Sequence, residues 1–404
     1  MIPEQPVWMD TPVEGEQINS AAISQDGMRC VYGTSSEYDS GVFSVYCYDR
    51  SKGTTGTVLW SNPVTSEQIY QGVFWVAISG DGNFAAAGGE TKKHGNDIGF
   101  LRAYDANSGE DLLSITLPSR VNQVALSEDG ESLVAVHGDT ISLYQLGSNG
   151  YQLSHQSQVK DYYLNSCVLT PKGDRVAISA TCYVKEEGKV SKTIGKVLAL
   201  NIDNGSFFEF SSVDLPVGSM RVAIADDGSY WGASLHDGSC AVFSADKPNE
   251  KLWDYKLPDC ALSVAYGFDL TKTSDGKVIC AVGVNLRSPR KTQDLGALYV
   301  VESVADKPEL SWWQYIQYEP NPGISLDKEA TYVTATDGKP DSHPTEGSVH
   351  ESPGNFYLYS NSGKGELCWK YSTPIMNWPM VISSKGNAIV GASDTGQVFY
   401  WQDS

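Results

Sequence analysis

Residues 76–89 read Val-Ala-Ile-Ser-Gly-Asp-Gly-Asn-Phe-Ala-Ala-Ala-Gly-Gly: an apolar run, a serine, an Asp-Gly pair and a second run that ends in small residues. Asp-Gly signals a tight turn, because glycine takes a positive φ without steric cost and aspartate tolerates the neighbouring position. The stretch therefore predicts a strand, a hairpin turn and a second, antiparallel strand.

The same phrase recurs along the whole chain. Clear copies occupy residues 21–33, 124–138, 168–180, 222–234, 274–283 and 380–393, and a degenerate copy at 323–336 has Asp327-Lys328 in place of Asp-Gly. The small anchor residues of the eight copies are Ser24, Ser79, Ser127, Thr170, Ala225, Ser274, Ser325 and Ser383. Their spacing of about 50 residues is typical of four-stranded propeller blades.

Two further β-rich runs follow each hairpin, and the fourth run is often marked by a tryptophan, as at Trp60, Trp253, Trp312 and Trp369. The last unit has only three runs, whereas residues 6–9 around Trp8 have the character of the missing fourth. We predict that this N-terminal strand completes the last blade, which would cover an otherwise open sheet edge.

The predicted fold is all-β: a single eight-bladed β-propeller of four-stranded antiparallel blades, closed by the N-terminal strand. The predicted blades are approximately residues 18–63, 72–118, 121–158, 164–213, 219–257, 260–316, 322–373, and 378–404 together with 5–10.

Charge and hydropathy exclude several classes of partner. The formal net charge is −20, with 49 acidic against 29 basic residues, so an extended phosphate-binding surface is not expected and nucleic acid is excluded as a partner. The first residues form no signal peptide, and no run of about 18 apolar residues predicts a membrane span. The expected location is cytoplasmic if Met1 is native; a mature extracellular or periplasmic fragment is the alternative.

Cysteines and histidines give weak signals. The eight cysteines form no CxxC pair. Cys30 and Cys47 fall on consecutive predicted strands, so they either form a disulfide or are two buried free thiols. His343 and His350 lie in an acidic loop, at a spacing that matches no known metal site. We interpret that loop as a polar surface segment rather than a metal site, and no cofactor is predicted.

The chain resembles the eight-bladed quinoprotein-like propellers and, more distantly, the WD-repeat proteins. Their tryptophan-docking phrase, Ala-x-Asp-x-x-Thr-Gly-x-x-x-Trp, is similar to Ala103, Asp105, Ser108 and Gly109, with Leu113 at the tryptophan position. A fainter echo is formed by Ala199, Asn201, Asn204 and Gly205. The resemblance implies the fold. Cofactor-bearing members use adjacent cysteines and a calcium-binding carboxylate set, and because no two cysteines are adjacent here, quinone-dependent activity is not expected.

In such a propeller the loops that join strands 2 and 3 of a blade, and those that join one blade to the next, emerge on one face. We call it the top face. Loops of the first kind are long at residues 90–98, 181–194, 284–295 and 337–354, and length without secondary structure is typical of binding surfaces. The sequence therefore points to the top face as the working surface.

The loops between blades bring aromatic and arginine residues to the mouth of the central channel. The predicted ligand- or partner-binding residues are Tyr70, Phe74, Arg120, Tyr162, Tyr163, Arg221, Tyr318 and Trp378. Flat rings beside arginines suit a peptide, a sugar or a small anion. The alternative is that these residues only fill the space between blades.

No catalytic constellation is present in the sequence. The leading hypothesis is a non-catalytic interaction or scaffold propeller that binds a protein or peptide through its top face. The alternative is a small-ligand-binding or metal-dependent enzyme propeller that uses the funnel around Arg120, Arg221 and Trp378. The sequence does not decide whether the chain is an enzyme, and the absence of a catalytic motif favours a protein that is not one.

Overall fold

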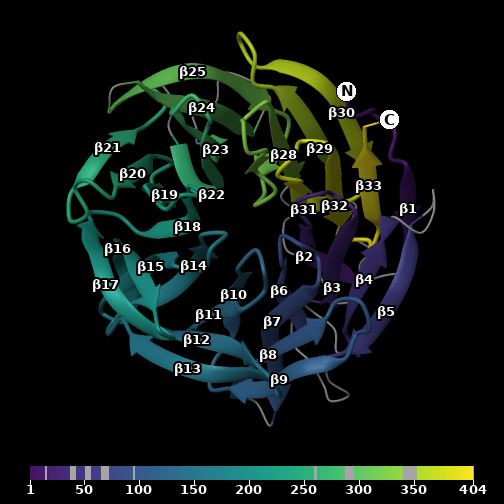
Figure 1. The fold of residues 1–404 in the computed structure, drawn as a ribbon. Coiled ribbons are helices and arrows are strands. Elements are labelled where there is room, and N and C mark those ends of the chain that lie inside the picture. The colour runs from purple at the N-terminus through teal and green to yellow at the C-terminus, as the bar shows by residue number, and fades with distance from the viewer. Residues whose placement is uncertain are drawn as a thin grey trace.

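The computed structural model describes residues 1–13, 16–36, 42–50, 56–64, 72–93, 96–258, 262–286, 295–304, 306–339 and 353–403. Eight antiparallel sheets are arranged around a central axis, and the two chain ends lie side by side (Figure 1). In seven sheets the strands follow chain order from the axis outward, and in the eighth the outermost strand is the first strand of the chain. This confirms the predicted eight-bladed propeller.

The first four blades contain these strands. Blade 1 has β2 (Gln17–Ile23), β3 (Arg29–Ser35), β4 (Ser44–Asp49) and β5 (Thr57–Pro63). Blade 2 has β6 (Gly72–Ile78), β7 (Phe84–Lys93), β8 (Asn96–Asp105) and β9 (Asp111–Leu117). Blade 3 has β10 (Val121–Leu126), β11 (Ser132–His137), β12 (Thr140–Gly147) and β13 (Gly150–Gln158). Blade 4 has β14 (Tyr163–Leu169), β15 (Arg175–Glu186), β16 (Lys189–Asp203) and β17 (Ser206–Leu215).

The remaining blades follow the same plan, with one split strand. Blade 5 has β18 (Ser219–Ile224), β19 (Tyr230–Leu235), β20 (Cys240–Ser244) and β21 (Lys251–Tyr255). Blade 6 has β22 (Leu262–Lys272), β23 (Val278–Leu286), β24 (Gly296–Val304) and β25 (Lys307–Ile316). Blade 7 has an inner strand split into β26 (Glu319–Pro320) and β27 (Ser325–Leu326), then β28 (Tyr332–Gly338), β29 (Gly354–Ser360) and β30 (Glu366–Thr373). Blade 8 has β31 (Asn377–Ile382), β32 (Ala388–Ser393) and β33 (Val398–Gln402), completed by β1 (Trp8–Asp10).

The hairpin between the first two strands of a blade is fixed by its anchor residue. In blade 2 the Ser79 hydroxyl accepts the backbone N–H groups of Asn83 (3.1 Å) and Phe84 (2.9 Å) and donates to Asp81 (2.6 Å). Gly82 completes the turn with a φ of +74°. The anchor hydroxyl thereby bonds the backbone of its own turn, which explains why the phrase recurs.

Two of the predicted anchors are wrong. In blade 6 the hydroxyl that donates to Asp275 belongs to Thr273, one residue before the predicted Ser274. In blade 7 the turn is closed by Asp327, whose carboxylate accepts the N–H of Tyr332 at 2.6 Å, two residues after the predicted Ser325. A carboxylate at the anchor position can bond the backbone without the Asp-Gly pair, which is why this copy looked degenerate.

Neighbouring blades are joined by a tryptophan that rests on a glycine. Trp60 of blade 1 donates its indole N–H to Ala106 (3.0 Å), and a Cβ at Gly109 of blade 2 would lie 2.6 Å from its ring. Only glycine fits there, and its φ of +77° is also one that glycine tolerates. The docking phrase at residues 103–109 therefore receives the tryptophan of the preceding blade.

The ring is closed as predicted. β1 pairs antiparallel with β33, with Trp8 opposite Tyr400. The Trp8 ring stacks between Tyr400 (5.5 Å between ring centres) and Tyr48 of blade 1 (5.1 Å). In Figure 1 the purple N-terminal strand accordingly lies beside the yellow C-terminal strands.

The disulfide alternative for Cys30 and Cys47 is not what the structure has. Both are free, buried thiols. The register places Cys30 opposite Tyr48 and Cys47 opposite Val31, one residue out of step. Side chains alternate between the two faces of a sheet, so the thiols point to opposite faces of blade 1.

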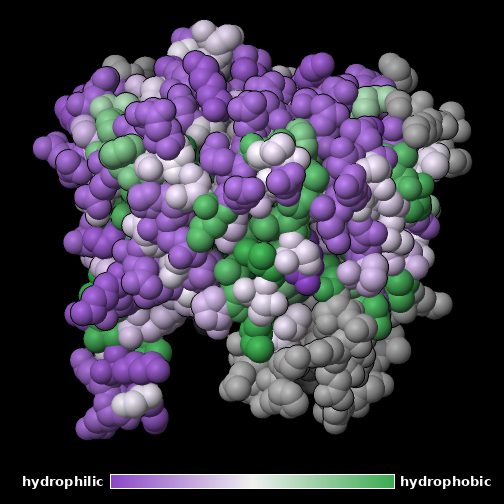
Figure 2. Space-filling view, turned by 60° about the horizontal axis from the view of Figure 1, so that its bottom comes forward, coloured by the Kyte–Doolittle hydropathy of each residue, from purple (hydrophilic) through white to green (hydrophobic). Residues whose placement is uncertain are grey.

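Two of the predicted long loops are instead strands. Residues 181–194 extend the pair β15 and β16 up to a turn at Glu187–Gly188, and residues 90–98 largely extend β7 and β8. The blade 4 extension is exposed and carries Tyr183 and Val190 at 44% and 53% exposure. An arm stands out from the ring at the lower left of Figure 2, on the side where Figure 1 shows β15 and β16. We call residues 181–194 the blade 4 arm.

Candidate functional site

The ladder between the first two strands is interrupted at the same level in every blade, near the top face. Seven blades have a register shift there, between Ile18 and Ser20, Val73 and Trp75, Val121 and Gln123, Leu164 and Ser166, Ser219 and Val222, Ser263 and Gly267, and Asn377 and Met380. In blade 7 the strand is broken between β26 and β27. A bulge re-aims a side chain and frees backbone groups.

The residues inside these irregularities surround the upper end of the channel. We call them the bulge ring: Asn19, Phe74, Asn122, Asn165, Met220 and Arg221, residues 264–266, residues 321–324, and Trp378 and Pro379. Three predicted residues, Phe74, Arg221 and Trp378, belong to it.

The asparagines of the bulge ring tie one blade to the next. Asn122 donates from Nδ2 to the carbonyl of Leu164 in blade 4 (2.6 Å), and Asn165 donates to that of Ser219 in blade 5 (2.7 Å). Each acceptor directly precedes the bulge of its own blade, so the asparagine satisfies a carbonyl that the bulge released. These bulges have a structural role.

An arginine just outside the bulge ring contacts residues of three blades. Arg120 precedes β10 and lies with its guanidinium carbon 4.6 Å from the centre of the Phe74 ring. Its Nε donates to Asn122 (2.9 Å), its Nη2 donates to the hydroxyl of Tyr163 (3.2 Å), and its Nη1 is 3.8 Å from the Glu90 carboxylate. Residues from blades 2, 3 and 4 thus hold one guanidinium at the channel mouth.

Arg221 reaches across the channel. It belongs to β18 of blade 5, yet its guanidinium carbon lies 4.3 Å from the centre of the Trp75 ring in blade 2. Its Nη1 donates to Gln123 of blade 3 (3.2 Å), whereas its Nε is buried without a hydrogen-bond partner. Burial lowers the pKa of Arg221 to about 10, and the positive charge of Arg120 acts in the same direction.

A cavity of about 290 Å³ occupies the channel and is lined by the inner strands, with Trp75, Gln123 and Arg221 among its walls. Asp269 of blade 6 also lines it, and its carboxylate accepts the N–H groups of Leu326 (2.7 Å) and Leu270 (2.8 Å). Burial raises the pKa of Asp269 to about 6 despite these hydrogen bonds. The cavity therefore contains one fixed cation and a carboxyl group that is readily protonated.

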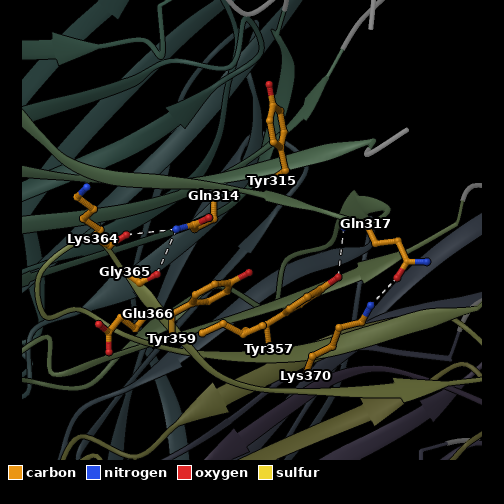
Figure 3. A pocket seen from close by; sticks show the side chains of 10 residues that line it. Gln314, Tyr315, Gln317, Tyr357, Tyr359, Lys364, Gly365, Glu366 and Lys370 are labelled. Atoms are coloured by element: carbon orange, nitrogen blue, oxygen red, sulfur yellow. Dashed lines mark hydrogen bonds between the residues drawn. The ribbon is translucent and has the colours of Figure 1, made fainter. Parts of the chain in front are cut away.

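A second hollow of about 540 Å³ lies between the outer strands of blades 6 and 7 (Figure 3). Gln314 donates to the carbonyls of Lys364 and Gly365 (both 3.3 Å), and Lys370 donates to Gln317 (2.5 Å). These bonds join the two blades. Although this hollow is larger, it combines side chains of only two blades, whereas the channel cavity is lined by residues of all eight blades. We therefore place the candidate site at the channel mouth.

Tyr162, Tyr318 and Trp378 form hydrogen bonds with residues of blades 4 and 7. Tyr162 donates its hydroxyl to Asp214 (3.2 Å), within blade 4 and away from Arg120. Tyr318 is fixed by its backbone N–H to Asp337 of blade 7 (2.9 Å). Trp378 is half-buried and its carbonyl accepts the hydroxyl of Thr336 (3.0 Å). Tyr70 lies outside the described residues.

Sequence reasoning missed Trp75, Gln123, Asn122 and Tyr266. Trp75 and Gln123 each follow a bulge residue, and their side chains contact Arg221. Tyr266 is 39% exposed and lies inside the blade 6 irregularity between Ser263 and Gly267. A pair of large polar or aromatic residues just before the apolar phrase, as in Phe74-Trp75 and Asn122-Gln123, was the available signal.

In the part of the chain that the structure describes, no group of three histidine, cysteine or carboxylate side chains is arranged to hold a metal ion. His137 and His236 bond serine and threonine hydroxyls of the blades around them. His343 and His350 lie outside the described residues. Across those same ranges no helix has the length and apolar character needed to cross a membrane.

No protein-family model and no curated protein matches the sequence. Solved structures do match. Sqt1 of Chaetomium thermophilum superposes with a TM-score of 0.69 at 12% identity, over 99% of this chain and 98% of that chain. The same protein bound to the N-terminus of the ribosomal protein L10 gives 0.67 at 12% identity, over 99% and 100%. The C-terminal WD40 domain of Sif2 gives 0.61 at 12% identity, over 98% and 99%. At this identity the likeness shows the fold: an eight-bladed β-propeller with WD40 structural neighbours.

Proposed function

We propose that this protein is a non-catalytic interaction propeller that binds a peptide segment of a protein partner at the channel mouth of its top face. The observation that carries the proposal is the bulge ring. Phe74, Arg221 and Trp378 all stand at bulge positions of the inner strands. Aromatic rings beside guanidinium groups provide rigid contact area with fixed hydrogen-bond donors.

The comparisons add an analogy at the level of the fold. Sqt1, which has the same overall architecture, has been solved with the N-terminus of a ribosomal protein bound. Fold similarity alone does not transfer a function. It supports the choice of a peptide as the class of partner, and it does not name the partner.

The test compares the two faces of the propeller. The bottom face is the opposite one, which carries the hairpins between the first two strands of each blade. Three baits are used in the source cell extract: the full chain, a top-face variant (Phe74→Ala with Tyr266→Ala) and a bottom-face variant (Lys272→Ala with Lys328→Ala). Lys272 and Lys328 form exposed ion pairs with Asp227 and Asp226, so their loss changes stability little. We expect a stoichiometric partner that the bottom-face variant retains and the top-face variant loses. Retention by both would contradict the proposal.

A further inference from the structure

The channel mouth holds two guanidinium groups at successive levels. Arg120 contacts Phe74 and Asn122, and Arg221 contacts the next residue of each strand, Trp75 and Gln123. The two arginines therefore share the same two walls, one above the other. The positive charge of Arg120 contributes to the lowered pKa of Arg221, after the larger effect of burial.

The two arginines differ in what balances their charge. Arg120 has the Glu90 carboxylate at 3.8 Å. Arg221 forms no ion pair with any residue in the described ranges, and its Nε has no acceptor. The acidic residue of the same cavity, Asp269, is bonded to two backbone N–H groups instead. Burying a guanidinium without a neighbouring anion costs free energy. A bound anion would therefore stabilise the Arg221 side chain in this position.

The surroundings select the kind of anion. One face of the Arg221 guanidinium is covered by the indole of Trp75, and Nη1 is bonded to Gln123, so a planar acceptor that approaches in the plane of the guanidinium is favoured. The cavity of about 290 Å³ admits a small group rather than a folded surface. With a net charge of −20 the protein repels anions at long range, so binding must rest on these short-range contacts.

We propose that the channel mouth is a carboxylate-binding site in which Arg221 is the anchoring residue and Arg120 the accessory one. The carboxylate is either an acidic side chain of the partner peptide or a free small dicarboxylate. In its peptide form the inference rests on the function proposed above; in its free form it does not.

The test uses Trp75 as a built-in reporter. The full chain is labelled with 5-fluorotryptophan, the Trp75 resonance is assigned with Trp75→Phe, and ¹⁹F spectra are followed at about 0.15 M salt, where long-range repulsion is screened beyond about 8 Å. The probes are sodium glutarate, the blocked peptide acetyl-Gly-Glu-Gly-amide, and its uncharged counterpart acetyl-Gly-Gln-Gly-amide. We expect saturable shifts with at least one carboxylate probe and none with the glutamine peptide.

Substitutions of the arginines test which side chain binds the carboxylate. Arg221→Met keeps the bulk of the side chain and removes no ion pair, so the protein should fold, which a thermal melt checks. We expect it to weaken carboxylate binding at least tenfold, and Arg120→Gln to weaken it less. Arg175→Lys is the matched control, because Arg175 also lies over a ring, that of Phe210 at 3.9 Å, but is bonded to the Gly228 carbonyl at a bottom hairpin.

The outcomes separate the two sources and the two proposals. Binding of glutarate and of the glutamate peptide supports the site for both sources, whereas glutarate alone supports the free dicarboxylate. Equal shifts with the glutamate and glutamine peptides, or unchanged binding by Arg221→Met, would overturn the inference. Loss of the protein partner in the bait experiment with intact glutarate binding would leave this site standing without the proposed function.

Discussion

The two faces of the propeller are built on opposite principles. On the bottom face, which carries the hairpins between the first two strands of each blade, most hairpins use a hydroxyl at the anchor position. Neighbouring hairpins are linked by backbone bonds such as Asp81 N–H to Glu128 (3.1 Å) and Glu128 N–H to Pro171 (2.8 Å). On the top face the bulges share a position but not a residue, and Arg221 leaves a polar atom without a partner. A repeated, satisfied face stabilises the ring, and a varied, unsatisfied one is free to bind.

The sharpest contrast should appear between two tryptophans. Trp60→Ala removes an 8% exposed ring from its glycine seat and its hydrogen bond to Ala106, and should lower the free energy of unfolding by about 3–5 kcal/mol. Trp378→Ala, at a half-buried bulge position, should lower it by less than about 2 kcal/mol. Urea unfolding of both variants measures this, and equal losses would remove the distinction between the faces.

Two glycines with similar backbones sharpen the comparison. Gly130 in the blade 3 hairpin has a φ of +71°, and a Cβ there would lie 2.1 Å from the Phe84 ring. Gly188 at the tip of the blade 4 arm has a φ of +78° and nothing within 4 Å. Gly188→Ala should cost about 1 kcal/mol for the left-handed backbone alone, and Gly130→Ala about 2–3 kcal/mol because repacking is added. Thermal melts in parallel would contradict this if the two midpoints fell equally.

Two asparagines at equivalent bulges of the top face differ in their hydrogen bonds, so replacing them should affect stability differently. Asn122→Ala deprives the buried Leu164 carbonyl of its donor and should cost about 1–3 kcal/mol. Asn19→Ala removes a half-buried side chain that makes no hydrogen bond within the described residues, and should cost under about 0.5 kcal/mol. Denaturant midpoints of the two variants measure this difference. A larger effect at Asn19 would show that the hydrogen bond from Asn122 to Leu164 does not have the structural role assigned to it.

A pH dependence is expected in the channel that joins the two faces. Because the folded-state pKa of Asp269, about 6, lies above its ordinary value of 3.8, its contribution to stability is full below about pH 4 and is lost as the pH rises through 6. Asp269→Asn should remove this slope and exceed the wild type by about 1–2 kcal/mol at pH 7, less at pH 4.5. Urea unfolding across that range is the check; a difference independent of pH would refute it.

The fold could be predicted because its signal is local. The hairpin phrase needs only a serine, an Asp-Gly pair and two apolar runs, and the closing strand was visible from Trp8. The errors came from register. A disulfide would need Cys30 and Cys47 opposite each other, but they are one residue out of step. Residues 181–194 were expected to be a loop, although they continue the β15–β16 ladder.

The site was predictable only in part for the same reason. Phe74, Arg221 and Trp378 were found because aromatic and arginine residues stand out between blades. That Arg221 would cross the channel to Trp75 depends on bulges in two strands that lie about 145 residues apart, and no local pattern encodes that distance. The hydrogen bonds of Asn122 and Asn165 to the neighbouring blades were missed because their acceptors are backbone carbonyls, which every residue type has.

The closing strand also determines how the ring responds to force. β1 contributes three residues antiparallel to β33, and the Met1 ammonium lies 2.7 Å from the Asp403 carboxylate, so both chain ends leave the pair on the same side. Tension applied between the ends would open this ladder one pair at a time, as a zipper opens, instead of shearing all pairs together. The seam held in solution by the stacked rings of Trp8, Tyr48 and Tyr400 is thus where a pulled molecule would first come apart.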